Sequence, residues 1–509
     1  MKKICSFFLM IIMVITIVSL QLTLTGCNKK KPDNETTQEA TTNPMDTAKE
    51  IEISIDENDV HQTIEGFGAS GAWWSQKAGG WTKIQKNGLE TREYIAKLLF
   101  DKEEGIGLNT YRYNIGAGSA DSGNGDISDS WRRAESFETE AGVYDFSKDE
   151  NAVWFMKRAT ELGVTDIVMF ANSPLERLTI TGNAHGQTGC SPDGKTTSNL
   201  APENYGKYAE YFLDVVEHFI GEGYPIKFIS PINEPQWEWV SGQEGCHYEP
   251  EEVVAFLKVF IEKKEARETL KDVEITVPES GEWGNTNYKY MEAILKDEYL
   301  SKYFSSIDNH SYWSDKNAKA TFKSWLNKQG FETLKLRTSE WCEMVNGIDY
   351  TMDSAINLAK EINDDLTVLD VVSWQYWIAV SCYNYRDGLI YVSKSGENIT
   401  VPKRLWAMGN FSKFIRPGYK RVASNVTASS VDVSAFIGNN GTNDEMILVI
   451  INSGVAGRKY DINSLAGSSQ VKVYTTDKTF NLEDTTDERY NEGNIYLSPQ
   501  SVTTIVLSK

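Results

Sequence analysis

Short apolar segments alternate with longer amphipathic segments over most of this chain. The short segments are rich in Val, Ile, Leu and Phe, which predicts buried strands, and apolar residues three or four positions apart in the longer segments predict helices. The predicted strands are 64–69, 108–115, 166–172, 226–233, 273–279, 307–310, 334–340 and 369–377. The helices predicted to follow them are 92–100, 151–162, 203–220, 250–265, 287–295, 321–328, 353–363 and 404–415. The pattern therefore predicts eight strand–helix units in succession.

This alternation decides the expected fold class. Strands that are each followed by a helix form a parallel sheet covered by helices, and eight such units fit an α/β fold of the (β/α)8, or TIM barrel, type. A doubly wound open sheet is the alternative, but no glycine-rich phosphate-binding motif follows an early strand. We therefore predict a barrel domain over residues 65–415.

The pattern changes near residue 416. Short β-branched segments such as VKVYTTD and SVTTIVLS are separated there by turns rich in Asn, Gly and Ser, which predicts an antiparallel β side domain over 416–509. Polar and apolar residues also alternate over 51–64, which predicts one or two edge strands before the barrel. We expect these strands to join the C-terminal sheet, so that both ends of the chain build one side domain.

The first 27 residues resemble a bacterial lipoprotein signal peptide. Lys2 and Lys3 precede an apolar run that ends in the residues LTGC, with Cys27 last. The resemblance implies cleavage before Cys27, a lipid on its thiol, and a location at the bacterial cell surface on the outer face of the cytoplasmic membrane. A transmembrane anchor is the alternative, because the apolar run is nearly long enough to span a bilayer. Residues 28–50 are polar, which predicts a flexible tether.

Composition narrows the range of partners. The net charge of −21 and the isoelectric point near 4.8 argue against nucleic acid or an anionic membrane surface, and they fit a neutral substrate. The later cysteines are not spaced as zinc ligands, so no metal is expected. These cysteines are Cys190, Cys246, Cys342 and Cys382. Cys190 and Cys246 could form a disulfide or remain free thiols, and the sequence leaves both possibilities open.

Two glutamates follow predicted strands in similar surroundings. Glu234 comes after the fourth strand in FISPINEPQWEW, where Pro235 cannot continue a strand ladder, and Glu340 ends the seventh strand in KLRTSEW. Catalytic groups of a (β/α)8 barrel lie at the carboxyl ends of its strands, and strands four and seven face one another across the mouth. Alone, either glutamate would be a solvated or structural carboxylate. Together they indicate cleavage of a glycosidic bond, which needs two carboxylates and no cofactor.

Further residues near the strand ends could bind a sugar. The candidates are Arg112, Asn172, Asn233, Tyr312, Trp74, Trp237, Trp341 and Trp374. Aromatic rings stack on sugar faces, although Trp74 and Trp374 could equally pack in the core. Arg112 lies within an apolar strand and needs a partner if it is buried, which favours a place in the site.

The motifs at these positions resemble those of glycoside hydrolase family 30 from about residue 60 to the C-terminus. They are GFGA at 66–69, RYNIG at 112–116, ANSP at 171–174, NEP at 233–235, SEW at 339–341 and FSKFIRPG at 411–418. The resemblance implies a barrel with a fused β domain and hydrolysis with retention, with Glu234 as general acid/base and Glu340 as nucleophile. It also implies that Asn233 holds the sugar 2-hydroxyl and that Arg112 and Tyr312 support Glu340.

Within that family, the opening ASGAWW at 69–74 is most similar to the endo-β-1,6-galactanase-like branch. We therefore expect a surface-anchored, monomeric enzyme that cleaves β-1,6-galactan side chains of arabinogalactan. A glucuronoxylanase or β-1,6-glucanase of the same family is one alternative. A lipoprotein that captures glycans without cutting them is the alternative from another class, and two opposed carboxylates favour the enzyme over it.

Overall fold

The computed structural model describes residues 44–122, 127–185, 198–284, 288–466 and 470–508. The predicted signal peptide with Cys27, most of the predicted tether, and Cys190 of the possible disulfide lie outside the described residues. Within these described ranges, no helix combines the length and the apolar character that crossing a membrane requires.

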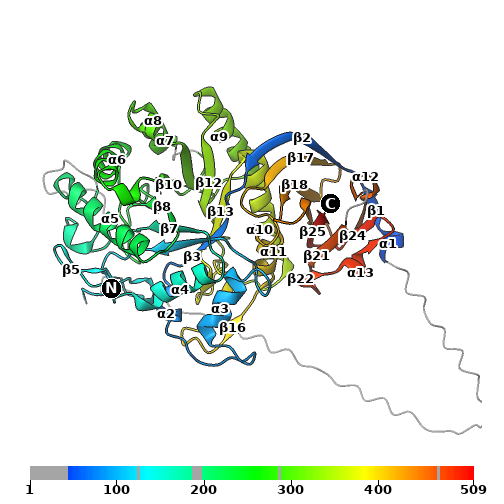
Figure 1. Cartoon of the computed structure of the whole chain (residues 1–509), viewed down its shortest axis with the longest axis horizontal. Helices are drawn as coiled ribbons and strands as arrows, with labels where there is room; N and C mark the ends of the chain where they lie inside the picture. Colours follow the sequence, from blue (N-terminus) through cyan, green and yellow to red (C-terminus); the bar gives the residue numbers. More distant parts are fainter. Residues whose placement is uncertain (1–43, 123–126, 186–197, 285–287, 467–469, 509) are drawn as a thin grey trace, which may run out of the picture. The chain divides into compact units, whose positions relative to one another are not determined.

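Parallel strands form the central sheet of the described chain (Figure 1). Their order is β10-β11-β12-β13-β3-β4-β7-β8-β9. They comprise β3 Gly66–Ser70, β4 Thr110–Asn114, β7 Asp166–Phe170, β8 Ile226–Ser230, β9 Glu274–Ile275, β10 Pro278–Ser280, β11 Ser306–His310, β12 Lys335–Glu340 and β13 Ser373–Tyr376. Because β9 pairs with β8 and β10 pairs with β11, the sheet closes into a ring if β9 and β10 count as one strand.

The two residues between β9 and β10 form backbone hydrogen bonds with β8 and β11, the strands on either side. β9 and β10 are therefore two halves of the fifth strand. The Thr276 N–H donates to Ile229 O of β8 at 2.8 Å, and Val277 O accepts from the Asp308 N–H of β11 at 2.8 Å. The predicted (β/α)8 barrel is therefore confirmed, but the predicted strand 273–279 is not continuous. Pro278 has no N–H to donate, and the pairing register shifts between Pro278 and Ser280.

Helices lie outside the strands of the barrel (Figure 1). The helices that follow the strands are α3 Thr91–Phe100, α4 Glu150–Glu161, α5 Tyr205–Gly221, α6 Pro250–Glu265, α7 Tyr288–Lys296, α9 Lys316–Lys328, α10 Met352–Asp364 and α11 Lys403–Ser412. The short helices α2 Ser75–Ala78 and α8 Leu300–Tyr303 complete this layer. The predicted bounds agree within a few residues, except that α9 begins well before residue 321. Asp315 caps this earlier start by accepting from the Ala318 N–H at 2.8 Å.

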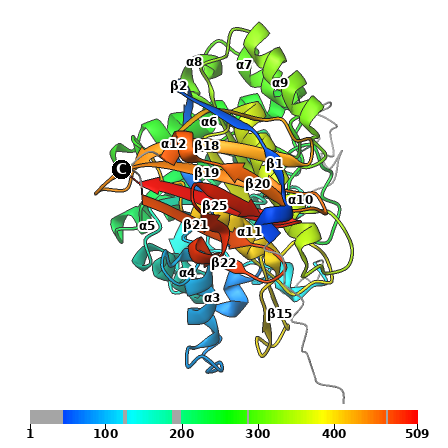
Figure 2. The ribbon, with the colours of Figure 1, turned by 90° about the vertical axis from the view of Figure 1, so that its right-hand side faces the viewer.

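The C-terminal residues form an antiparallel β domain (Figure 2), as predicted. One sheet has the order β2-β17-β18-β19-β25-β21-β22, and the second has the order β1-β20-β24-β23. The strands are β1 Lys49–Ile51, β2 Ile53–Thr63, β17 Lys420–Val426, β18 Val431–Asn439, β19 Asp444–Asn452, β20 Arg458–Asp461, β21 Gln470–Thr476, β22 Asn481–Asp484, β23 Tyr490–Asn491, β24 Asn494–Leu497 and β25 Ser501–Ser508. β2 pairs with β17, so residues before and after the barrel share one sheet.

Apolar residues of both sheets form the core of this domain, including Val433, Leu448 and Ile495. The barrel helix α11 contacts β21, β22 and β25. At this contact Asn410 Nδ2 donates to Thr504 Oγ1 at 2.9 Å, and the Thr504 O–H donates to Asn410 O at 2.7 Å. The side domain therefore packs against the last helix of the barrel through a buried, reciprocal pair of hydrogen bonds.

Residues 44–51 depart from the prediction of a tether that extends to residue 50. They form α1 Pro44–Thr47 and β1, and β1 pairs in parallel with β20. Met45 and Ile51 are buried. Polar composition indicates a solvated segment, but pairing with a strand near the other end of the chain is a long-range contact that local composition does not contain.

Candidate active site

Glu340 is the last residue of β12 and lies at the carboxyl end of the barrel. Its Oε2 accepts from Arg112 Nη1 at 2.7 Å, and its Oε1 accepts from the Tyr312 O–H at 2.9 Å. Burial raises the pKa of Glu340, and the positive charges of His310 and Arg112 and the Tyr312 hydrogen bond oppose this rise. The negative charge of Glu234 adds to the effect of burial, so the neighbouring donors offset only part of it and the pKa of Glu340 stays above its ordinary value.

Glu234 follows β8, but this strand ends at Ser230, earlier than predicted. Glu234 lies instead in the loop, with a left-handed backbone at φ 45°. Its N–H donates to Glu279 O at 2.9 Å. Its carbonyl accepts from the Trp237 N–H at 3.2 Å and from Trp239 Nε1 at 3.1 Å. A residue other than glycine in this region is strained, and these hydrogen bonds hold the turn that directs the carboxylate inward.

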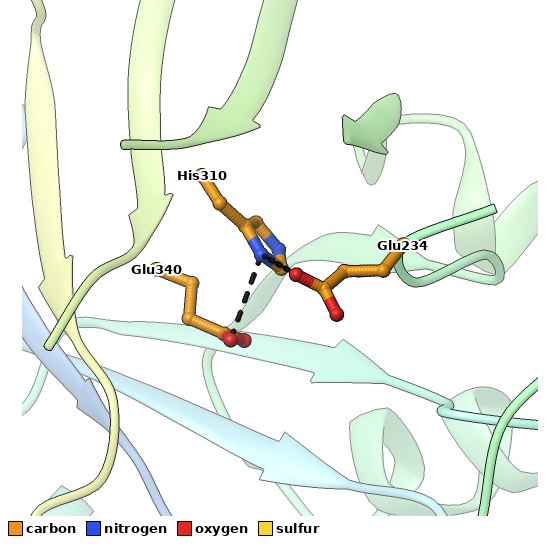
Figure 3. A group of neighbouring side chains, drawn as sticks. All are labelled: Glu234, His310 and Glu340. Carbon is orange, nitrogen blue, oxygen red and sulfur yellow. Dashed lines mark hydrogen bonds and ion pairs between the residues drawn. The ribbon is translucent and has the colours of Figure 1, made fainter. Parts of the chain in front are cut away.

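His310, at the end of β11, lies between the two glutamates (Figure 3). Its Nδ1 is 3.1 Å from Glu234 Oε1 and 3.5 Å from Glu340 Oε1. One oxygen of each glutamate and one nitrogen of His310 all lie within 4.8 Å of one another. Burial lowers the pKa of His310, but the surrounding carboxylates outweigh burial and raise the pKa to about 10. His310 is therefore a cation at neutral pH, and both glutamates face its charge.

Glu279, from β10, is a third buried carboxylate. Its Oε2 lies 3.4 Å from Arg112 Nη2 and 3.3 Å from His310 Nε2. The Ser339 O–H donates to Oε2 at 2.5 Å, and the Thr276 O–H donates to Oε1 at 2.9 Å. Burial raises the pKa of Glu279, but Arg112 and His310 outweigh burial and lower the pKa to about 2. Glu279 therefore stays an anion and holds both cations in place.

Neither Glu279 nor His310 was predicted from the sequence as a site residue. Each is an ionisable residue at the end of a predicted strand, which is the signal that could have identified it. Arg112 was expected to need a buried partner, and it has two, Glu340 and Glu279. Its guanidinium also lies over the Phe170 ring, 3.7 Å from the centroid.

A chain of amides fixes Asn233. Arg112 Nη2 donates to Asn233 Oδ1 at 3.0 Å, and Asn233 Nδ2 donates to Asn172 Oδ1 at 3.1 Å. Asn172 Nδ2 in turn donates to Asn114 Oδ1 at 3.1 Å. Asn233 lines the cavity described next, whereas Asn172 is buried behind it. The structure therefore places Asn172 where it orients Asn233, and not on the surface where a substrate contact was predicted.

The two glutamates line a cavity of about 630 Å³. Aromatic and polar side chains line the cavity in equal number, and this combination suits a sugar, whose ring faces are apolar and whose hydroxyls are polar. Its aromatic lining consists of Trp73, Trp237, Trp239, Tyr312, Trp313, Trp377, Tyr383 and Tyr385. Its polar lining consists of Arg132, Asn233, Glu234, Gln243, Glu340, Asn346, Asn384 and Asp387, and Cys342 and Met344 complete it.

Trp237 lies in the lining, as predicted for a substrate contact, but Trp74 does not. Trp74 has no exposed surface. Its Nε1 donates to Ser70 O at 2.9 Å, and its ring packs edge-on against Phe155. The adjacent Trp73, whose backbone is left-handed at φ 69°, lines the cavity instead. Neighbouring tryptophans point to different sides of the chain, and composition does not tell which one faces the site.

Trp374 and Trp341 are also buried and lie outside the lining formed by the described residues. Trp374 Nε1 donates at 2.8 Å to Oδ2 of Asp365, which follows α10, so the ring faces the helical layer. Trp341 packs against it, with ring centroids 6.2 Å apart. Trp377 lines the cavity instead. Trp377 follows the last residue of β13, so the alternation of side chains along that strand does not tell which tryptophan faces the cavity.

Glu234, His310 and Glu340 are also of the residue types that bind metal ions. A histidine that ligates a metal must give up the proton from the ligating nitrogen. The carboxylates around His310 hold that proton, because they raise the pKa of the imidazole to about 10. This opposes metal binding, and the expectation of no metal and no organic cofactor stays a prediction.

A (β/α)8 barrel with two carboxylates in one cavity at its mouth defines a class of protein, the glycosidases that work through paired carboxylates. The family model described as O-Glycosyl hydrolase family 30 matches residues 50–391. The chain therefore belongs to glycoside hydrolase family 30 and is an O-glycosyl hydrolase. The family and the enzyme class expected from the sequence are confirmed.

Relatives in this family carry different substrate names. The endo-β-1,6-galactanase of Hypocrea rufa is 22% identical over 450 residues, which cover 79% of this chain and 81% of that protein. The glucuronoxylanase XynC of Bacillus subtilis is 25% identical over 358 residues, which cover 67% of this chain and 74% of that protein. A conserved exported protein from Bacteroides fragilis has a similar structure, with a TM-score of 0.76, 27% identity, and coverage of 89% of this chain and 99% of that chain.

We expect His310 to keep its charge well above neutral pH. Its pKa is raised from 6.5 to about 10, so its proton stabilises the folded state fully below about pH 6.5, and this stabilisation is lost as the pH rises towards about 10. The ¹⁵N chemical shifts of the imidazole, followed by NMR during a pH titration, should therefore change with a midpoint near 10. A His310→Gln variant identifies the signals. A midpoint near the ordinary value of about 6.5 contradicts the prediction.

Proposed function

We propose that this protein is a retaining glycosidase that cleaves β-linked polysaccharide, with Glu340 as nucleophile and Glu234 as general acid/base. One observation carries the proposal: an oxygen of Glu234 and an oxygen of Glu340 lie within 4.8 Å of one another. Retaining enzymes hold the two carboxyl groups about 5–5.5 Å apart. Inverting enzymes need about 6.5–9.5 Å, because a water molecule must fit between the sugar and the base.

Contacts distinguish the roles of the two glutamates. Among the described residues, Glu340 has two cationic neighbours, Arg112 and His310, whereas Glu234 has one, His310. Positive charge and the Tyr312 hydrogen bond favour the ionised form of Glu340, which is the form that attacks carbon. Glu340 is therefore assigned as the nucleophile, and Glu234 takes the remaining role of general acid/base.

The proposed reaction has two displacements. Glu340 attacks the anomeric carbon and forms an ester bond, while the bond to the leaving oxygen breaks and that oxygen takes the proton of Glu234. In the second step Glu234 removes a proton from water, and the oxygen of that water replaces Glu340 at the anomeric carbon. Two inversions at one carbon give net retention.

Asn233 fits the proposed contact with the sugar 2-hydroxyl. Its Oδ1 is occupied by Arg112, and one N–H of Nδ2 is occupied by Asn172. The second N–H of this amide remains to donate, and Asn233 lines the cavity beside Glu234. A hydrogen bond to this hydroxyl strengthens in the transition state and supplies part of the rate acceleration.

We propose β-1,6-galactan as the substrate, in keeping with the branch that the opening motif resembles. The endo-β-1,6-galactanase of Hypocrea rufa matches more of this chain than the glucuronoxylanase XynC does, 79% against 67%. Charge in the cavity also supports a neutral sugar. Among the described lining residues, Arg132 is the one permanent cation, and Glu234, Glu340 and Asp387 outnumber it. Such a lining favours galactan or glucan over a glucuronate-bearing xylan.

Substitution of the two glutamates should separate their roles. Glu340→Gln should lower kcat by at least about 10⁴-fold, because the covalent route is lost. With azide and an aryl β-glycoside, Glu340→Gly should give the α-glycosyl azide and Glu234→Gly the β-glycosyl azide, because azide enters on the face that each carboxylate has vacated. Glu238→Gln, an exposed residue of the same loop, is the matched control and should keep full activity. Unchanged turnover in Glu340→Gln would remove Glu340 from the mechanism.

A panel of polysaccharides tests the substrate. Purified protein is incubated with β-1,6-galactan, glucuronoxylan and β-1,6-glucan, and the released reducing ends are counted and sized. We expect kcat/KM on β-1,6-galactan to exceed the others by at least about tenfold. The Glu340→Gln protein, prepared in the same way, excludes a contaminating enzyme. Preference for glucuronoxylan would contradict the proposed substrate, and no release from any glycan would favour a capturing protein.

We also propose that the enzyme is anchored to the outer face of the cytoplasmic membrane by a lipid on Cys27, and that it acts as a monomer without nucleic acid. The motif LTGC and the polar residues after it support this location. When the chain is expressed in bacteria, it should partition with membranes and incorporate labelled fatty acid. Cys27→Ser should abolish the labelling, and labelling that persists in this variant would place the lipid elsewhere.

A further inference from the structure

Exposed tryptophan is concentrated at one place on the molecule. All fourteen tryptophans lie within the described residues, and only Trp237 and Trp313 are exposed, by 45% and 58%. Both line the cavity that contains the two glutamates. Burial of such a ring would stabilise the protein by about 25 cal/mol for each Å² of apolar surface removed from water, and an exposed ring lacks this stabilisation. Large apolar surfaces at the edge of a cavity indicate a ligand that covers them.

The two rings form a corner at the cavity edge. Their centroids are 5.9 Å apart and their planes meet at 73°. Trp237 belongs to the loop after β8, and Trp313 follows β11 next to Tyr312, whose ring centroid lies 5.5 Å from that of Trp313. When the side-chain amide of Gln236 is oriented so that its oxygen faces hydrogen-bond donors, this oxygen accepts from the Gly281 N–H at 3.0 Å and from Trp237 Nε1 at 2.9 Å. The indole N–H is therefore satisfied within the protein, and the ring offers its face to a ligand.

The position of the corner relative to Glu234 fixes which part of a substrate it meets. The backbone N–H of Trp237 donates to the backbone carbonyl of Glu234 at 3.2 Å. The Trp237 ring and the Glu234 carboxyl group therefore belong to one tight turn. Glu234 is the group that protonates the departing oxygen, and the sugars attached to that oxygen pass this turn. This step rests on the proposed function, because it takes Glu234 as the acid.

Of the other three tryptophans of the cavity, Trp239 is half-buried, and Trp73 and Trp377 are enclosed. Trp73 and Trp377 are 7% and 8% exposed, and they pack edge-on with ring centroids 5.0 Å apart. The cavity thus combines closed aromatic walls with one open aromatic corner on the side of the acid. We propose that Trp237 and Trp313 form a binding site for the leaving-group side of the substrate, where they stack on the apolar faces of neutral sugar rings beyond the cleaved bond.

Two substrates with the same glycone separate this role from catalysis. One is the polysaccharide that the wild-type enzyme cleaves, and the other is the glycosyl fluoride of the sugar unit it releases, which carries no sugar on the leaving side. The double variant Trp237→Ala/Trp313→Ala should lose at least about tenfold in kcat/KM on the polysaccharide, because stacking is lost there. On the fluoride it should stay within about twofold of the wild type. Tyr299→Ala, an exposed aromatic residue outside the cavity lining, is the matched control and should change neither rate.

The possible outcomes distinguish the two proposals. If the double variant cleaves the polysaccharide at the wild-type rate, the stacking site is overturned. An equal loss of activity on both substrates also overturns it, because the tryptophans would then position the glutamates and not the leaving-group sugars. In both cases the proposed hydrolase function stands. A wild-type enzyme that cleaves neither substrate overturns the proposed function and this inference together. Circular dichroism of each variant verifies the fold, and oligosaccharide binding to Glu340→Gln, with and without the two tryptophans, tests stacking without turnover.

Discussion

Five ionisable side chains held out of water determine this active site. The carboxyl groups of Glu234, Glu279 and Glu340 surround the cations of Arg112 and His310, and each of the five residues is less than a tenth exposed. Like charges repel strongly where water does not screen them, so the removal of one cation would leave facing carboxylates without compensation. The five residues come from β4, the loop after β8, β10, β11 and β12. A closed ring of strands is what brings their ends to one place.

The same cluster fits the movement of charge in a double displacement. In the proposed first step, Glu340 loses its negative charge to an ester bond and Glu234 becomes an anion as it gives up its proton. The total charge of the pair does not change. The Nδ1 of His310 lies 3.1 Å from one glutamate and 3.5 Å from the other, so it faces whichever is ionised. Arg112 and Tyr312 favour the charge on Glu340 before the attack. Because the cation is already fixed between the two glutamates, the active site needs little rearrangement as the negative charge moves from one to the other.

Much of the fold could be predicted from the sequence, because strands and helices leave local patterns. The eight strand–helix units, the antiparallel domain and the contribution of both chain ends to it follow from periodicity and turn residues. The split of the fifth strand at Pro278 and the pairing of β1 with β20 do not, because both depend on neighbours that are distant in the sequence. The bounds of single strands also differ, as where β8 ends before Glu234.

The site was predictable only in part, for a related reason. Glu234, Glu340, Arg112 and Tyr312 could be expected together, because they lie at or near strand ends of one barrel. Glu279 and His310 were not assigned, since an ionisable residue at a strand end gives no sign of which charges it will face. The choice between Trp73 and Trp74 depends on a local turn in the backbone.

The stereochemistry of hydrolysis tests the double displacement most directly. When a β-linked oligosaccharide is mixed with the enzyme, ¹H NMR of the anomeric protons shows which form of the new reducing end appears first. Attack by Glu340 followed by attack of water predicts that the β form appears first and that the α form grows only later, as the free sugar mutarotates. An α form that appears first would mean a single displacement by water, and Glu340 could not then be the nucleophile.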